Sequence, residues 1–284
     1  MTPRVGLVGT GRMGGPMARR ILAAGFPLTV TDAHAANAQA LRSAGAALAP
    51  DAAGVAANAD VAITCVPGPA EVEAVYFAPD GLLASAHPGT IFLETSTIDV
   101  ALSRRIGAAC AERGLGYLDA PISGGVGGAE AGTLTVMVGG DAATLDEARP
   151  VLACFANRVV HLGATGAGHF TKLINQIVYL GYVALFCEAT AAADAYGIKR
   201  DDLIDVLRHS VGGEPLSTHW EERLLSGDRT PGFQLARVLK DLRLGAAAYD
   251  DVACAAPIFT AALAAFESAA ANGHAGDDMT TVLL

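Results

Sequence analysis

Arg4-Val-Gly-Leu-Val-Gly-Thr-Gly-Arg-Met-Gly14 opens the chain with a short apolar run that leads directly into three spaced glycines. Gly9 permits a tight turn, Gly11 lets the backbone approach phosphates, and Gly14 lets a following helix pack against the strand. The amino end of that helix directs its free N–H groups toward an anion. The stretch therefore predicts a turn that binds the pyrophosphate of a dinucleotide. We expect the cofactor-binding residues of this turn to be Gly9, Gly11, Arg12, Met13 and Gly14.

A second β-rich run, from Pro27 to Thr31, ends in an acidic residue, Asp32. This residue follows the glycines by roughly 20 positions, the spacing at which a carboxylate accepts hydrogen bonds from the adenosine ribose. A carboxylate there also repels the 2′-phosphate of NADP, so the sequence favours NAD as the cofactor. Residues 33 to 37 contain no arginine, but Arg12 in the turn could reach a phosphate, and NADP stays possible.

Composition excludes several classes of protein. With 284 residues, of which 52% are hydrophobic, the chain can form one large domain or two. Its net charge of -10 argues against a nucleic-acid surface, because no basic stripe is present to neutralise phosphates. The five cysteines and seven histidines lack the spacing of a disulfide framework or a metal site. We therefore expect no metal and no nucleic-acid partner.

The sequence also predicts a cytoplasmic protein. Arginines and glycines interrupt any signal-peptide core near the amino terminus. The most apolar later stretch, from Leu173 to Cys187, contains polar residues and falls short of the ~20 residues that cross a bilayer. No membrane span is expected.

The first part of the chain alternates short β-rich runs with helical segments, which predicts a mainly parallel sheet with crossover helices. We interpret residues 1–162 as a Rossmann-type, doubly wound α/β domain. The glycine-rich segment from Ser123 to Gly132 is expected to be a functional loop. The predicted strands are Val5 to Val8, Leu28 to Thr31, Val61 to Cys65, Ile91 to Glu94, Gly116 to Asp119, Leu134 to Val138 and Val159 to His161.

The pattern becomes helical after Gly168, and no convincing strand follows. The change predicts an all-helical second domain, residues 163–284, which begins with a long interdomain helix. Three glycines in the six positions from Gly163 to Gly168 mark the connection. The predicted helices are Phe170 to Tyr196, Asp201 to His209, Leu235 to Tyr249 and Cys254 to Ala271.

Four polar residues interrupt the otherwise apolar start of the long helix. Lys172, Asn175, Gln176 and Tyr179 stand at offsets of 0, 3, 4 and 7, so they share one helical face. One interpretation is that this stripe faces solvent. The other is that it faces a cleft beside the nicotinamide, where a partly desolvated lysine can exchange protons at neutral pH. The spacing alone leaves both interpretations open.

Several motifs resemble those of the β-hydroxyacid dehydrogenase family, which includes 3-hydroxyisobutyrate dehydrogenase and tartronate semialdehyde reductase and is related to 6-phosphogluconate dehydrogenase. The resemblance covers nearly the whole chain, in the right order, and includes the glycine turn. The other motifs that carry it are Ser96-Thr97, the stretch Asp119-Ala-Pro-Ile-Ser-Gly-Gly-Val-Gly-Gly-Ala-Glu-Ala-Gly-Thr133, the stretch Gly166-Ala-Gly-His-Phe-Thr-Lys172-Leu-Ile-Asn175-Gln176, and Lys240-Asp241-Leu242.

This resemblance implies an NAD(P)-dependent oxidoreductase that interconverts a short 3-hydroxy acid and its semialdehyde or keto form. It makes Lys172 the catalytic acid and base. It implies that substrate is bound by Ser123, Gly124, Gly125, Asn175 and Lys240. It places Val66, Pro67, Thr97 and Lys240 near the nicotinamide and its ribose. An alternative for Lys240 is a surface ion pair with Asp241 or Asp250.

The chain departs from the family pattern at the substrate site. Members that act on 3-hydroxyisobutyrate usually have Asn-Asn where this chain has Asn175-Gln176, so the substrate stays open. The segment from Val211 to His219 is expected to shape the substrate pocket. Two alternatives stand beside the dehydrogenase: an imine reductase, which generally lacks the lysine, and a non-catalytic NAD-responsive binding protein. The apolar helix from Phe170 to Tyr196 resembles family helices at subunit interfaces, which predicts a homodimer or homotetramer.

Overall fold

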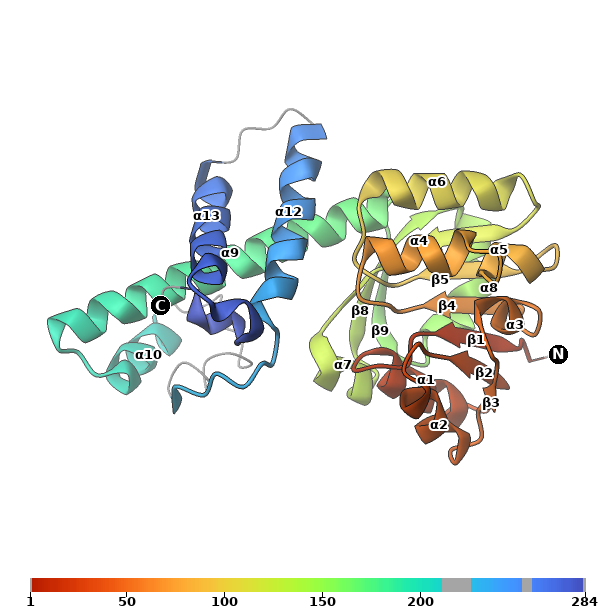
Figure 1. Ribbon diagram of the computed structural model, residues 1–284, viewed down its shortest axis with the longest axis horizontal. Helices are drawn as coiled ribbons and strands as arrows, with labels where there is room; N and C mark the ends of the chain where they lie inside the picture. The colour runs from red at the N-terminus through yellow and green to blue at the C-terminus, as the bar shows by residue number, and fades with distance from the viewer. Residues whose placement is uncertain (1, 211–225, 252–256, 283–284) are drawn as a thin grey trace. The chain divides into compact units, whose positions relative to one another are not determined.

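The computed structural model describes residues 2–210, 226–251 and 257–282 (Figure 1). The expected pocket segment from Val211 to His219 lies outside the described residues, as does Cys254. The chain divides into two compact units, Met1–Lys172 and Leu173–Leu284. The first is built on a sheet and the second is helical, so the predicted fold class is confirmed.

One nine-stranded sheet forms the centre of the first unit. Its order is β3-β2-β1-β4-β5-β6-β8-β7, and β9 pairs with β8. All pairs from β3 to β6 are parallel, as is β8 with β9, whereas β8 is antiparallel to β6 and β7. The strands are β1 (Val5–Val8), β2 (Leu28–Thr31), β3 (Ala47–Leu48), β4 (Val61–Thr64), β5 (Ile91–Glu94), β6 (Gly116–Asp119), β7 (Ile122–Ser123), β8 (Leu134–Gly140) and β9 (Ala156–His161).

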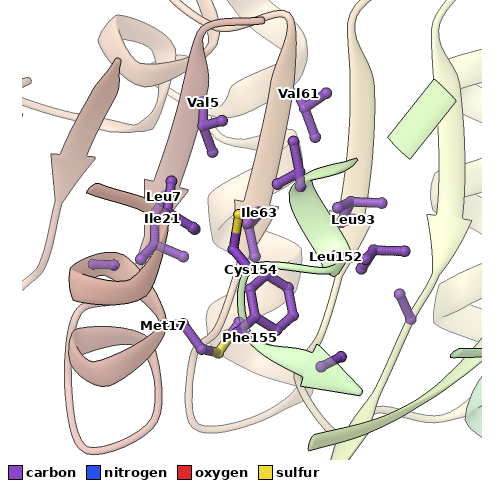
Figure 2. Packing of buried hydrophobic residues seen from close by; sticks show 14 of the residues in the cluster. Val5, Leu7, Met17, Ile21, Val61, Ile63, Leu93, Leu152, Cys154 and Phe155 are labelled. Atoms are coloured by element: carbon purple, nitrogen blue, oxygen red, sulfur yellow. The ribbon is translucent and has the colours of Figure 1, made fainter. Parts of the chain in front are cut away.

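Helices cover both faces of this sheet because successive strand residues point to opposite sides. Leu7, Ile63 and Leu93 pack with α1, α2 and α8, as Figure 2 shows in part, whereas Val8, Ala62 and Phe92 pack with α3 to α6. A strand buried on both faces reads as a continuous apolar run, which explains the sequences of β1 and β4. The helices are α1 (Gly14–Ala23), α2 (Ala35–Arg42), α3 (Ala52–Ala56), α4 (Pro69–Phe77), α5 (Leu82–Ser85), α6 (Val100–Ala111), α7 (Gly125–Ala131) and α8 (Ala142–Leu152).

The segment from Ser123 to Gly132 is not a loop, so that prediction is wrong. Ile122–Ser123 forms strand β7 and Gly125–Ala131 forms helix α7. Ala129 is fully buried, and Arg20 donates a hydrogen bond to the carbonyl oxygen of Glu130 near the end of α7. These tertiary contacts stabilise a helix that the intrinsic propensity of its glycines disfavours.

The second unit contains most of α9 (Ala167–Tyr196), together with α10 (Arg200–Arg208), α12 (Leu235–Asp251) and α13 (Pro257–Ala271). Two short 3₁₀ turns follow, His274–Gly276 and Met279–Thr281. Residues of α9, α12 and α13 share one apolar core that includes Leu180, Leu242 and Phe266. The described residues of this unit contain no named strand, only an isolated bridge between Gln234 and Asp278.

By length and composition, α9 is the single helix of the described chain that could span a membrane, over Ala167–Cys187. Half of that window is buried in the protein, and the core helices of soluble proteins pass the same test. The observation is therefore weak support for a span.

Candidate active site

The glycine turn has the geometry that its sequence predicts. Gly9 has a φ of 91°, and a side chain there would collide with the carbonyl of Cys65. A side chain on Gly14 would collide with the carbonyl of Gly9. Gly11 has a negative φ and no atom within 4 Å of an added Cβ, so neither backbone nor protein packing requires its glycine. The open space beside Gly11, which a side chain would fill, fits a ligand that approaches the backbone.

The amino end of α1 is suited to an anion. No side chain caps it, and its first turn contains no acidic residue. N–H groups at a helix start attract negative charge. The turn lies at the carboxyl end of β1, between β2 and β4, where the strand order reverses and such sheets bind dinucleotides. These residues fit the pyrophosphate of NAD(P).

Asp32 follows β2 and joins the glycine turn to the next loop. Its Oδ2 accepts hydrogen bonds from the backbone N–H (2.7 Å) and hydroxyl (3.2 Å) of Thr10. Its Oδ1 accepts from the backbone N–H of His34 (2.8 Å) and the amide of Asn37 (3.2 Å). The side chain is half-buried. Four donors hold the carboxylate at the rim of the glycine turn.

Three neighbouring strands end in polar residues at the same edge of the sheet. Thr64 of β4 pairs in register with Glu94 of β5, and Glu94 pairs with Asp119 of β6. All three side chains are fully buried. The carboxyl edge of a parallel sheet is where such folds place their chemistry.

Glu94 lies at the centre of this row. Its Oε1 accepts a hydrogen bond from the backbone N–H of Ser96 (2.8 Å), and its Oε2 has no hydrogen-bond partner among the described residues. Burial raises the pKa of Glu94 to about 8, although hydrogen bonds from Ser96 oppose the rise. At neutral pH this carboxyl group is therefore protonated in the folded protein.

The expected nicotinamide loops follow β4 and β5. Val66 donates its backbone N–H to the hydroxyl of Ser96 (2.9 Å), and Gly9 lies against the same loop. Pro67 is exposed and Thr97 is half-buried. Burial raises the pKa of the Cys65 thiol beside them to about 11, which excludes a thiolate at neutral pH. The structure thus brings Val66 together with the glycine turn.

The expected substrate residues of the first unit lie at the end of β7. Ser123 is half-buried, and Gly124 and Gly125 are exposed. Gly124 has a φ of 131° and Gly125 a φ of 64°. Side chains are strained at these angles, so the conformation requires glycine at both positions.

Asp119 fixes the start of α9. Its Oδ1 accepts a hydrogen bond from the backbone N–H of Gly166 (2.8 Å), and its Oδ2 accepts one from that of His169 (2.9 Å). Burial raises the pKa of Asp119, and these backbone amides oppose the rise. A side chain on Gly168 would collide with the carbonyl of Met137 in β8, so α9 begins in close contact with the sheet.

Lys172 is the last residue of the first unit and is only 7% exposed. Gln176, one turn further along α9, is also 7% exposed. The interpretation in which the polar stripe faces solvent is therefore wrong for these two residues. A buried lysine is rare unless it is paired or functional.

Asn175 and Lys240 belong to the second unit. There Asp241 of α12 contacts both Lys240 and Gln176, the neighbour of Asn175. Asp241 is buried, accepts a hydrogen bond from Gln176 (2.7 Å) and forms an ion pair with Lys240 (2.7 Å). The amide of Asn175 donates to that of Gln176 (3.5 Å). Lys240 thus forms an ion pair with Asp241, one of the two partners that the sequence offered as an alternative to a role near the nicotinamide. The contact to Asp241 also gives a structural reason for glutamine at position 176.

Sequence reasoning did not assign site roles to Glu94, Ser96, Asp119 or His169. Ser96, Asp119 and His169 all appeared in motifs, but their meeting is shown only by the register of β5 and β6 and by the hydrogen bonds at the start of α9. Among the described residues, no three His, Cys, Asp or Glu side chains are grouped to hold a metal ion.

Comparison with known proteins agrees with this geometry. Residues 4–163 match the family model for the NAD binding domain of 6-phosphogluconate dehydrogenase. Residues 166–284 match the model for the NAD-binding part of NADP-dependent 3-hydroxyisobutyrate dehydrogenase.

The chain is 38% identical to the NAD-dependent L-serine dehydrogenase of Pseudomonas aeruginosa, over 98% of this chain and 96% of that protein. It is 32% identical to the 2-(hydroxymethyl)glutarate dehydrogenase of Eubacterium barkeri, over 99% and 93%. The structure of Mycobacterium tuberculosis 3-hydroxyisobutyrate dehydrogenase with L-serine superposes with a TM-score of 0.86, at 34% identity, over 100% and 98% of the two chains.

The doubly wound sheet, the glycine turn and the two family models together define an NAD(P)-dependent oxidoreductase. The chain belongs to the β-hydroxyacid dehydrogenase family, as its motifs indicated. It is an NAD(P)-dependent 3-hydroxyacid dehydrogenase.

Proposed function

We propose that the protein oxidises the hydroxymethyl group of an acid HO–CH₂–CH(X)–COO⁻ to the semialdehyde, and catalyses the reverse reduction. The observation that carries the proton transfer in this proposal is the burial of Lys172 on a helix anchored at the carboxyl edge of the sheet. The relatives are named for L-serine, 3-hydroxyisobutyrate and 2-(hydroxymethyl)glutarate, which all share this skeleton and differ only in X.

Lys172 removes the hydroxyl proton during oxidation and returns it during reduction. Its burial removes the amine from bulk water, so that it can exchange this proton directly with the substrate. When bound, NAD(P) supplies the nicotinamide that exchanges a hydride with the hydroxyl-bearing carbon. The protein positions the two reacting carbons and manages one proton.

The remaining site residues bind and orient the substrate and the cofactor. Ser123, Gly124 and Gly125 present backbone N–H groups to the substrate carboxylate, and Asn175 orients the substrate. Lys240 serves the nicotinamide end of the site, and its ion pair with Asp241 restrains the lysine side chain. Residues 1–162 act as the dinucleotide domain and 163–284 as the domain for substrate and subunit contacts. The cofactor contacts are made by Gly9, Gly11, Arg12, Met13, Gly14, Asp32, Val66, Pro67 and Thr97.

A substrate panel tests the proposed function. Nicotinamide absorbance is followed with L-serine, 3-hydroxyisobutyrate, 2-(hydroxymethyl)glutarate, the secondary alcohol 3-hydroxybutyrate and the 2-hydroxy acid lactate. We expect at least one hydroxymethyl acid to react faster than the last two. Turnover of lactate alone would reject the proposed skeleton. Reduction of a cyclic imine without turnover of any alcohol would favour the imine reductase alternative, and cofactor binding without any turnover would favour the non-catalytic one.

The proposed cofactor is NAD, on the basis of the charge at Asp32. Replacing Asp32 with serine removes the carboxylate that ribose hydroxyls would bond. A hydrogen bond to a charged group contributes about 1.5 to 3 kcal/mol, so we expect NAD affinity to fall roughly 10- to 100-fold. NADP affinity should fall less or rise, because the repulsion of its phosphate is gone. The measurement is titration with both nucleotides.

Asp141→Ser is the matched control for this titration. Asp141 is an exposed aspartate that caps α8, and serine preserves that cap. Its NAD affinity should equal that of the unaltered protein. An unchanged ratio of NAD to NADP affinity in Asp32→Ser would reject the ribose role of Asp32.

The proposed assembly is a homodimer or homotetramer. Val178 (51% exposed), Tyr182 (38%) and Leu185 (59%) are spaced by four and three residues on α9, so they form one exposed apolar stripe. Such a stripe is costly in water and is typical of a subunit contact. We expect Leu185→Glu to lower the sedimentation coefficient, whereas Val206→Glu, at an exposed apolar position of α10, should not. A monomeric unaltered protein at micromolar concentration would refute this proposal.

The cytoplasmic location of the protein stays a prediction.

A further inference from the structure

His169 is completely buried in the first turn of α9, one turn before Lys172, and the proposed function leaves it without a role. A buried imidazole is retained at a cost unless its nitrogens are satisfied. Its contacts therefore show what the position requires.

The Nε2 atom of His169 lies 3.0 Å from the carbonyl oxygen of Ser96. A carbonyl oxygen can only accept, so Nε2 carries the proton and donates it. On the other side of the ring, Nδ1 lies 3.7 Å from Oδ2 of Asp119, which also accepts the backbone N–H of His169. The ring is thus oriented between the end of β6 and the loop that follows β5.

Ser96 connects this ring to the expected nicotinamide loop. It is buried, its backbone N–H donates to Glu94, and its hydroxyl accepts the backbone N–H of Val66 (2.9 Å). Thr97 follows directly in the chain. One residue therefore contacts the ends of β4 and β5 through its amide and hydroxyl, and the start of α9 through its carbonyl.

Lys172 follows His169 by three residues on the same helix, so both lie on neighbouring parts of its surface. A shift of the first turn of α9 relative to the Ser96 loop would move the lysine amine relative to the loop that carries Val66. Misplacement of a reacting group by about 1 Å can cost roughly 100-fold in rate.

We propose that His169 is a positioning residue for the dehydrogenase reaction, and that its hydrogen bond to the Ser96 carbonyl holds the Lys172 turn of α9 in register with the loop after β4. This inference rests on the proposed roles of Lys172 and Val66. Asp119 supports it by anchoring the same turn through backbone hydrogen bonds. His169 itself does not contact the reacting atoms in this scheme.

Three substitutions test the hydrogen bond. Glutamine can place its Nε2 where that of histidine lies and donate to Ser96, whereas asparagine is one methylene too short and leucine has no donor. We expect His169→Gln to keep kcat within about threefold of the unaltered protein. His169→Asn and His169→Leu should lose roughly 10- to 100-fold in kcat, with KM for the hydroxy acid changed less than kcat.

Two further readouts separate positioning from general damage. Hydrogen exchange of the Ser96 and Thr97 amides should rise in the asparagine and leucine variants and stay slow in the glutamine variant, while NAD affinity changes little in all three. A substrate deuterated at the hydroxyl-bearing carbon should show a larger isotope effect on kcat in the impaired variants, because hydride transfer becomes more rate-limiting.

A glutamine variant as impaired as the asparagine variant would overturn the proposal, as would a leucine variant with normal kcat. If His169→Leu does not fold, the glutamine and asparagine pair decides alone, and loss of NAD binding in all three variants would reject positioning in favour of a folding role. Failure of the proposed function is distinguishable, because the unaltered protein would then turn over no hydroxymethyl acid, or Lys172→Ala would retain that turnover, whatever residue stands at position 169.

Discussion

Replacing Lys172 with alanine is expected to lower kcat for the preferred hydroxy acid by about 10²- to 10⁴-fold, the usual contribution of a general acid or base. The reason is that the variant has no amine to accept the hydroxyl proton. NAD affinity should change little, since the glycine turn and Asp32 are untouched. Steady-state turnover and a nucleotide titration on the same preparation measure both quantities.

The chain offers a sharp control for this experiment, because it contains only three lysines, Lys172, Lys199 and Lys240. Lys199 is exposed ahead of α10, so Lys199→Ala should be fully active. Added methylamine should restore part of the activity of Lys172→Ala by supplying a small base to the space left by the side chain. Turnover of Lys172→Ala within a few-fold of the unaltered protein would remove the lysine from the mechanism.

Local sequence was sufficient for the parts of the fold that depend on local physics. The glycine turn combines one positive φ with one close helix contact, and both follow from residue type. The buried strands β1, β4 and β5 are continuous apolar runs with clear ends. The two-residue strands β3 and β7 were not predicted, because two residues cannot show a period.

Helix α7 was predicted as a loop for a different reason. Glycine is a poor helix former, so a segment rich in glycine reads as irregular. Contacts from elsewhere in the chain reverse that preference, among them the hydrogen bond from Arg20 of α1 to Glu130. Sequence separation hides such contacts from any argument about local propensity.

The cluster of buried polar side chains at the sheet edge could not be predicted from local sequence for the same reason. Glu94 and Asp119 look like ordinary residues at the ends of two strands that are 25 positions apart in the chain. Only the parallel register of β4, β5 and β6 brings them side by side. Lys172 was suspected from helical spacing and family resemblance, but its burial required the structure.

Glu94 makes the stability of the first unit depend on pH. Its pKa is raised from 4.5 to about 8 by burial, so between these values the folded state holds a proton that the unfolded state releases. The contribution of Glu94 to the free energy of unfolding is therefore greatest below about pH 4.5 and is lost as the pH rises toward 8. Each pH unit in this window costs about 1.4 kcal/mol, or on the order of 3 kcal/mol by pH 7.

Glutamine in place of Glu94 has nearly the shape of the protonated glutamate side chain and does not ionise in this pH range. Glu94→Gln should therefore unfold at the same temperature as the unaltered protein near pH 5 and at a temperature several degrees higher near pH 8. The contribution of every other titrating group cancels when the two pH profiles are subtracted. Glu147→Gln, an exposed site on α8, should leave the profile unchanged. Parallel profiles for Glu94→Gln and the unaltered protein from pH 5 to 8 would show that the carboxyl group already ionises in the folded state, because water or a neighbouring donor then stabilises its charge.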